Sequence, residues 1–351
     1  MITGKKRSEK EYRKLDMLSS SDLRMFASDR KKFYNKVVLK EFQEEESSRA
    51  ILIGNLCHCL ILEPEEFDNK FFMSICSNPP TEKMLDFVNA LFKHTVINSD
   101  ESGNVTCDFE YIAKEAYAEA GFKWKFETVM EKFIGSEAEN YYKELRESKT
   151  KGLQVVCVED LDIATKIVQR IKEDEFAGEI FNQENTDSVL IFNELQAEGF
   201  GVLGLEMKAM IDKIIVNHNS KTIQIYDLKV VWDNQNFVRE YYLKKMAYIQ
   251  AYIYHRALLS GVIYLGFDYE DYEILPPIFV VVDSSNFYSP LLYKLSVEDL
   301  EMAYKGFSYN GREYKGVFEI INELKFAMET GRFNISKEAW QSGGVVCLNI
   351  G

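Results

Sequence analysis

The decapeptide "TIQIYDLKVV", residues 222–231, constrains the fold of this chain more than any other stretch. Its β-branched and aromatic residues predict a buried strand, but Asp227 and Lys229 interrupt it. Because side chains alternate between the faces of a strand, both charges share a face with Ile223 and Ile225. Burying an acid and a base there is costly unless something compensates. The local pattern fits two interpretations equally well: a structural ion pair at a strand end, or a site that uses both charges.

The preceding residues predict a hairpin partner for this strand. Residues 201–216 are also strand-like, and the polar turn "NHNSK" connects them to the decapeptide. If the two strands pair, Asp212 meets Asp227 and Lys229 near one end of the sheet. Two carboxylates in an apolar setting resist joint ionisation, and a divalent cation resolves this by taking both as oxygen ligands. Lys229 can then hold or deprotonate an attacking water and offset phosphate charge, so the spacing suits metal-dependent phosphodiester hydrolysis.

The order of elements predicts an α/β or α+β fold with one central sheet. Helical patterns precede strand patterns, which begin at 187, and a long helix is expected over 236–259. We expect a single domain, 1–351, made of four consecutive parts. These are the N-terminal helices at 17–69, a helical insertion at 70–150, a sheet with its flanking helix at 151–265, and a C-terminal strand and helices at 266–351.

Composition narrows the function only a little. The formal net charge of −14 counts against a protein that slides freely on nucleic acid, although a nuclease that holds metal ions needs acids of its own. No apolar run is long enough for a transmembrane helix, and the N-terminus lacks the apolar run of a secretory signal. The six cysteines form no CxxC pair, which favours reduced thiols in a cytoplasm and indicates no zinc site.

The hairpin "MKAMID…IYDLKVV" resembles the core of the PD-(D/E)xK nuclease superfamily, and more specifically the exonuclease VIII (RecE) type, which resects double-stranded DNA ends in phage recombination. Three further stretches carry the resemblance: "LSSSDLRMFASDRKKFY", "GNLCHCLILEPEEFDNKF" and "YIQAYIY". It covers roughly residues 17–72 and 155–260. The resemblance implies a restriction-endonuclease-like core, a central mixed sheet flanked by helices. Its expected cofactor is Mg²⁺, with Mn²⁺ as a substitute.

The resemblance also assigns roles to individual residues. The residues that it places in the catalytic site are Lys229, Asp212, Asp227, His58, Gln250 and Tyr254. The metal ligands that it implies are Asp212, Asp227, the Leu228 carbonyl, His58 and an upstream acid, for which Asp187 fits better than Glu194. The candidates for holding the DNA backbone are Arg24, Arg30, Lys31, Lys32, Lys244 and Lys245.

Plainer readings of these residues exist. A lone histidine on an apolar helix is more often a core residue, but Gly54, expected to admit a close neighbour, and the "LEP" that follows favour a site role for His58. Gln250 and Tyr254 also suit ordinary packing. The chain departs from the family where Met210 and Ile211 replace an expected Arg-Pro, and where Ala247 replaces an expected tyrosine.

The leading expectation is a Mg²⁺-dependent DNA exonuclease that resects double-stranded ends for recombination or replication. Two alternatives stay open: an endonuclease or repair nuclease on flaps or single strands, and a non-catalytic DNA-end-binding recombination protein. The expected partners are DNA ends, a single-strand annealing protein and further copies of the chain, with no membrane. The expected location is the cytoplasm, that of a bacterial host if the chain is phage-encoded.

Overall fold

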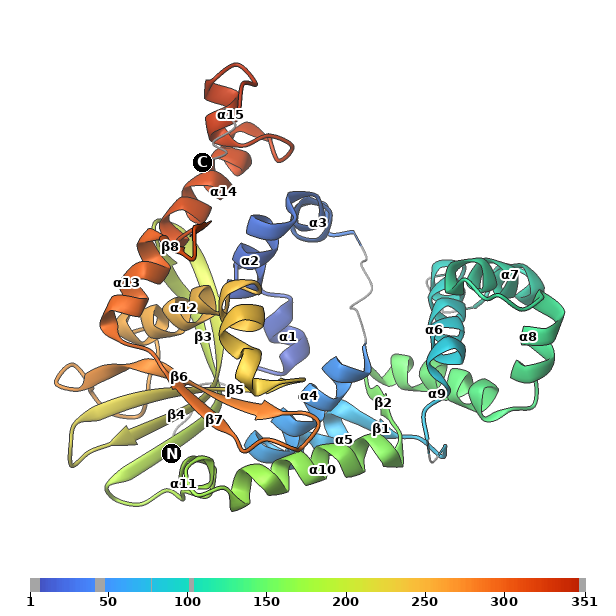
Figure 1. The fold of residues 1–351 in the computed structure, drawn as a ribbon, viewed down its shortest axis with the longest axis horizontal. Helices are drawn as coiled ribbons and strands as arrows, with labels where there is room; N and C mark the ends of the chain where they lie inside the picture. Colours follow the sequence, from blue (N-terminus) through green and yellow to red (C-terminus); the bar gives the residue numbers. More distant parts are fainter. Residues whose placement is uncertain (1–6, 42–47, 77, 101–103, 347–351) are drawn as a thin grey trace. The chain divides into compact units, whose positions relative to one another are not determined.

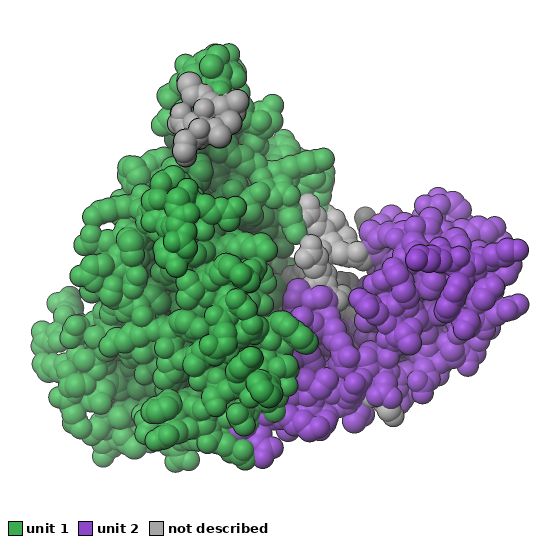
Figure 2. All heavy atoms as spheres, viewed as in Figure 1, with its two compact units in different colours: residues 1–43, 170–351 green, residues 44–169 purple. Residues whose placement is uncertain are grey.

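The computed structural model describes residues 7–41, 48–76, 78–100 and 104–346. The chain forms two compact units, one of residues 1–43 and 170–351, the other of residues 44–169 (Figure 2). The sequence predicted one domain with an insertion at 70–150, whereas the second unit already begins at residue 44 and therefore includes the helix that carries His58. Within the described residues, no helix is long and apolar enough to cross a membrane.

The second unit is mainly helical. Its helices are α4 (Arg49–Leu62), the 3₁₀ turn η2 (Pro64–Glu66), α5 (Phe67–Lys70), α6 (Glu82–Ile97), α7 (Phe109–Ala120), α8 (Phe126–Phe133) and α9 (Glu137–Lys151). Two short parallel strands, β1 (Phe71–Met73) and β2 (Gln154–Val156), pair within it. Helix α10 (Val158–Glu173) runs across the boundary at 169/170. As predicted, α4 ends just before Pro64.

The first unit is built on a five-stranded sheet of order β3-β4-β5-β6-β7 (Figure 1). The strands are β3 (Val189–Val202), β4 (Leu205–Asn217), β5 (Thr222–Val231), β6 (Glu273–Asp283) and β7 (Leu291–Lys294). Only the β5–β6 pair is parallel, so the sheet is mixed, and the predicted α/β class with a central mixed sheet is confirmed. The predicted strand at 222–231 is β5, and the predicted hairpin turn joins β4 to β5.

The first unit also contains several helices. They are α1 (Glu9–Arg13), α2 (Ser20–Ser28), α3 (Arg30–Phe33), the π-helix η1 (Tyr34–Val38), α11 (Ala177–Phe181), α13 (Val297–Lys305), α14 (Val317–Thr330) and α15 (Lys337–Gln341). A small hairpin, β8 (Phe307–Tyr309) and β9 (Arg312–Tyr314), lies between α13 and α14. Apolar side chains of α2, α14 and the helix α12 (Ala247–Leu259) form one core with β3, β4 and β5.

The expected continuous helix over 236–259 is wrong. The structure has the 3₁₀ turn η3 (Asn234–Asn236), the π-helix η4 (Val238–Leu243) and then α12. Met246 lies between the last two with φ of 54°, in the left-handed region that a non-glycine side chain disfavours. Helical periodicity continues in the sequence on both sides, so the pattern alone did not reveal the break. The break fixes the start of α12, and hence the direction of its side chains.

The ladder of paired residues between β4 and β5 is short, and it ends at the two predicted site acids. Pairing runs from Asn217↔Thr222 to Lys213↔Tyr226 and stops there. Asp212 and Asp227 are the next residues on each strand, directly past the last pair. Two strands that stop sharing backbone hydrogen bonds leave room between them for other groups. The sheet therefore opens at the two acids that the sequence singled out.

Gly54 and Gly316 differ in how closely other atoms pack against them, and Gly54 is packed less closely than the sequence predicted. A Cβ at Gly54, in the middle of α4, would meet nothing within 4 Å, so Gly54 does not admit a close neighbour as predicted. A Cβ at Gly316 would lie 2.2 Å from the backbone nitrogen of Gly306, which itself has φ of 89°. The chain thus crosses itself at Gly306 and Gly316, between α13 and α14, in a contact that only glycine permits.

Substituting each glycine by alanine should change stability in opposite directions. Gly54→Ala should raise the free energy of unfolding by about 0.5–1 kcal/mol, because alanine loses less backbone entropy in a helix. Gly316→Ala should lower it by roughly 1–3 kcal/mol, because backbone atoms must shift. Urea denaturation of both variants measures this. Equal effects of the two substitutions would contradict the described packing.

Candidate metal centre

Three buried acids lie at one level across three neighbouring strands. Around Glu194, β3 pairs with β4 through Asn193↔Lys213 and Leu195↔Ile211, which places Glu194 opposite Asp212. On the other side of β4, Asp227 follows the last pair of the β4–β5 ladder. The exposed fractions of the three residues are 7% for Glu194, 7% for Asp212 and 1% for Asp227. The sheet thus holds a row of carboxylates where water has little access.

The backbone at Glu194 is strained. Its φ is 48°, in the left-handed region, although the residue lies inside a long strand and is not glycine. Such a conformation costs of order 1–3 kcal/mol and persists where the surrounding structure enforces it, often at functional sites. A carboxylate oxygen of Glu194 lies within 4.8 Å of one of Asp212. The strain therefore coincides with two like charges held close together.

Each aspartate is oriented by donors from neighbouring elements. The backbone N–H of Leu228 donates to Oδ2 of Asp212 at 2.8 Å, in place of a regular ladder bond. Gln250 Nε2 donates to Oδ1 of Asp227 at 2.9 Å. Lys229 forms an ion pair with the other oxygen of Asp227, and its side chain is 21% exposed. The acid and the amine that interrupt the decapeptide therefore form a pair, and the amine reaches solvent.

Helix α12 supplies the polar cover of this row. Gln250 and Tyr254 are four residues apart on it, and Gln250 Nε2 also donates to the Tyr254 hydroxyl at 2.7 Å. Burial, followed by the charges of Asp212 and Asp227, raises the pKa of Tyr254 well above its ordinary value. The phenol consequently stays protonated beside the acids. The structure places Gln250 in direct contact with Asp227, and Tyr254 in contact with Gln250; their role in catalysis stays a prediction.

Arg24 also faces the site, from helix α2. Burial lowers its pKa, while the negative charge of nearby Asp227 acts in the opposite direction. Its Nη1 donates weakly to the Lys245 carbonyl at 3.5 Å, and its buried Nε has no hydrogen-bond partner among the described residues. The sequence suggested Arg24 only as one of several backbone contacts. Its guanidinium instead lies next to the start of helix α12.

The other predicted DNA contacts are more scattered. Arg30 donates to Glu323 at 2.6 Å and to the Ile335 carbonyl at 3.0 Å, so its guanidinium ties α3 to the C-terminal helices. Lys244 pairs with Glu240 at 3.1 Å, and Lys245 lies over the Tyr241 ring at 4.1 Å. Four of the predicted lysines are exposed: Lys31 and Lys32 on α3, and Lys244 and Lys245 in the turn that follows η4.

The remaining predicted ligands have different outcomes. Asp187 is exposed and precedes β3, while Glu194 is buried beside Asp212, so the order of preference between the two acids is reversed. The strand pattern did not reveal this, because it gave no register between β3 and β4. His58 lies half-buried on α4 of the second unit, and its role as a ligand stays a prediction. The same holds for the Leu228 carbonyl.

The donor set of this row fits a hard divalent cation. Carboxylate oxygens are the ligands that Mg²⁺ prefers, and two buried carboxylates within 4.8 Å repel each other unless a proton or a cation lies between them. Glu194, Asp212 and Asp227 would hold such an ion, and Lys229 would stand beside it. No thiol contributes to the row, so soft metals have no favoured ligand there.

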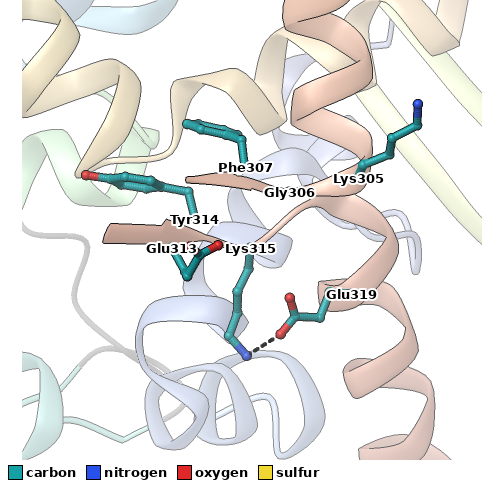
Figure 3. Close-up of a pocket in the computed structure, with 7 residues that line it drawn as sticks. All are labelled: Lys305, Gly306, Phe307, Glu313, Tyr314, Lys315 and Glu319. Carbon is teal, nitrogen blue, oxygen red and sulfur yellow. Dashed lines mark ion pairs between the residues drawn. The ribbon is translucent and has the colours of Figure 1, made fainter. Parts of the chain in front are cut away.

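A shallow cavity of about 330 Å³ lies elsewhere in the first unit (Figure 3). Its lining residues are Lys305, Gly306, Phe307, Glu313, Tyr314, Lys315 and Glu319. Figure 3 shows Lys315 directed at Glu319, with which it pairs at 2.6 Å. The cavity contains none of the site residues. Its backbone supports the site indirectly, because the Tyr248 hydroxyl of α12 donates to the Lys315 carbonyl at 3.0 Å.

A mixed sheet that carries acids and a lysine on adjoining strands defines a protein of the PD-(D/E)xK class. Residues 19–325 match the model of the family described as "PDDEXK-like domain of unknown function (DUF3799)", and the chain belongs to this family. No curated protein matches the sequence. The chain is also similar to a crystal structure from Eubacterium rectale that is described as a "putative exonuclease". The match covers 99% of this chain and 88% of the other chain, with 13% sequence identity and a TM-score of 0.42.

Sequence analysis missed one buried charge beside the site. Lys213 follows Asp212 and is 3% exposed. Its Nζ donates to Asn193 Oδ1 at 3.3 Å and lies 5.7 Å from the centre of the Phe181 ring. Burial lowers the pKa of Lys213 to about 8. Alternation along β4 could have indicated that 212 and 213 face opposite sides, but not that both sides are covered.

Lys213 makes stability depend on pH. Below pH 8 the amine is charged in both states, and the folded state carries the penalty of a buried charge. As the pH rises from 8 to 10.5, the folded protein loses this proton before the unfolded chain does, so this group's contribution to stability rises. Lys213→Met should therefore be more stable than wild type at pH 7, by on the order of 3 kcal/mol. Urea denaturation should find this gap closed above pH 10.5; a gap that does not change with pH would contradict the assignment.

Proposed function

We propose that this chain is a Mg²⁺-dependent deoxyribonuclease of the PD-(D/E)xK type, and that it acts as an exonuclease on the ends of double-stranded DNA. The observation that carries the proposal is the row of Glu194, Asp212 and Asp227 at the point where β4 and β5 separate, with Lys229 paired to Asp227. Buried acids gathered at one level of a sheet are costly to desolvate, and such clusters are frequent at functional sites. A metal-dependent phosphodiesterase would give this cluster a function.

The chemistry follows from where these groups lie. Glu194, Asp212 and Asp227 would hold Mg²⁺; when bound, the ion supplies positive charge for the scissile phosphate and acidifies a water. Lys229, whose side chain is 21% exposed, holds the attacking water and accepts or offers a proton at Nζ. Gln250 fixes the rotamer of Asp227 through its amide N–H. Protonated Tyr254 adds no further negative charge to a site that must admit a phosphate.

His58 and the basic residues complete the proposal. His58 is proposed as a further ligand, on the strength of the Gly-x-x-x-His motif alone. Arg24 is proposed to contact a DNA phosphate, because its half-buried side chain lies near Asp227. The exposed Lys31, Lys32 and Lys244 would hold the backbone more loosely. An annealing protein and self-association, both implied by the resemblance, stay predictions.

The first test is cleavage of end-labelled linear and closed circular duplexes in Mg²⁺. We expect degradation of the linear duplex only, since an exonuclease needs an end. Asp227→Asn and Lys229→Met should each lower the rate by roughly 10²–10⁴-fold, because one loses a metal ligand and the other a proton-transfer group. Cutting of circles would favour the endonuclease. If wild type cuts neither DNA, the non-catalytic DNA-binding alternative is favoured.

A second test separates the two candidate upstream acids. Glu194→Gln should lose activity nearly as fully as Asp227→Asn, because it removes a carboxylate of the buried row. Asp187→Asn is the matched control and should cleave like wild type, because Asp187 is exposed and lies before β3. Melting temperatures of both variants check that they fold. Loss of activity in Asp187→Asn with a normal Glu194→Gln would contradict the described site.

A further inference from the structure

Three aromatic side chains are exposed together at the end of the parallel strand pair. Trp232 is 77% exposed, Phe287 is 75% exposed and Tyr288 is 43% exposed. We call these three residues the aromatic ridge. Large apolar side chains held in water lose the stabilisation that burial would give, so a group of them indicates a surface that binds something.

The ridge lies at the carboxyl ends of β5 and β6. Trp232 directly follows β5, while Phe287 and Tyr288 belong to the connection from β6 to β7. Val231 pairs with Asp283, and the Ser284 N–H donates to the Val231 carbonyl at 2.7 Å, so the two segments are adjacent. Trp232 comes three residues after Lys229, roughly 10 Å along the strand.

The connection that carries Phe287 and Tyr288 is held in place. Buried Asp283 accepts hydrogen bonds from the backbone N–H groups of Ser285, Phe287 and Tyr288, at 2.9, 3.0 and 3.0 Å. Asn234 Nδ2 donates to the carbonyl of Ser289 at 2.7 Å. These hydrogen bonds fix the backbone of the connection, so the exposure of its aromatic rings does not result from disorder. The rings are presented to solvent on a fixed frame.

We propose that the aromatic ridge is a base-stacking surface for a single DNA strand that reaches the carboxylate row. This inference rests on the proposed function and adds a substrate feature to it, an unpaired stretch of nucleotides next to the cleaved bond. The argument for DNA is continuity, because Trp232 directly follows the strand that carries Lys229 and the connection with Phe287 and Tyr288 is adjacent to it. Bases stack on aromatic faces without regard to sequence, which suits a nuclease that degrades any end.

Two acids near the ridge are held by hydrogen bonds within their own segments. The carboxylate of Asp283 is buried and used by the backbone of its own connection. Asp233 accepts from the Gln235 N–H at 2.8 Å and from the Asn236 side chain. Arg170 lies on the other side, where its Nη2 donates weakly to the Ser289 hydroxyl at 3.5 Å. Stacking on the rings, rather than charge, therefore carries the proposed binding.

The test uses the fluorescence of Trp232 in the full chain. The chain has three tryptophans, so Trp124→Phe with Trp340→Phe leaves Trp232 as the only one. Titration with a twelve-residue oligo-dT in Ca²⁺ should quench its emission, because a base stacked on the indole does so. Anisotropy of the labelled oligonucleotide gives the affinity independently. In the wild-type background, Trp232→Ala and Phe287→Ala should each weaken binding by about five- to hundredfold.

The controls make the result specific. Trp340→Ala, which removes another half-exposed tryptophan, should bind like wild type, and Phe287→Tyr should retain affinity. Normal DNA affinity in both alanine variants, with Trp232 emission unchanged by the oligonucleotide, would overturn the base-stacking proposal. Cleavage of linear DNA by wild type would still support the proposed function in that case. If the alanine variants sediment differently from wild type but bind DNA equally well, the base-stacking proposal is overturned and the ridge is a contact between protein chains. Absence of any DNA binding or cleavage would overturn both proposals.

Discussion

Repulsion between buried carboxylates is the constraint around which this sheet is built. Glu194 and Asp212 approach within 4.8 Å, and Asp227 follows on the next strand with 1% of its surface exposed. Like charges at this separation in a poorly hydrated place cannot all ionise unless positive charge joins them. Lys229 provides one such charge from the protein itself, directed at Asp227. A divalent cation would add further positive charge to the row.

The fold accepts this row by giving up regular geometry around it. The β4–β5 ladder ends one residue before Asp212 and Asp227, and the Leu228 N–H turns to the Asp212 carboxylate. Glu194 takes a left-handed backbone conformation inside β3, and Met246 takes another just before α12. The large apolar core that α2, α12 and α14 share with the sheet offsets the energetic cost of this backbone strain. Rigidity in the core thus holds the site in shape.

The sequence predicted the hairpin and its charges because alternation along a strand is a local property. Asp227 and Lys229 were placed on one face by spacing alone, and Gln250 with Tyr254 by the helical repeat. Glu194 was ranked second, since its nearness to Asp212 depends on the β3–β4 register, which is set by distant residues. The break at Met246 and the burial of Lys213 likewise arise from tertiary packing, and no local pattern contains them.

The central claim is that the three acids form a cation site with Lys229 beside it. The most direct measurement is anomalous diffraction from crystals soaked in Mn²⁺. The account predicts one or two peaks within coordination distance of Asp212 and Asp227, with an oxygen of Glu194 in the same shell. A soaked crystal with no peak there, with the carboxylates turned away from each other and the amine in bulk solvent, would contradict it.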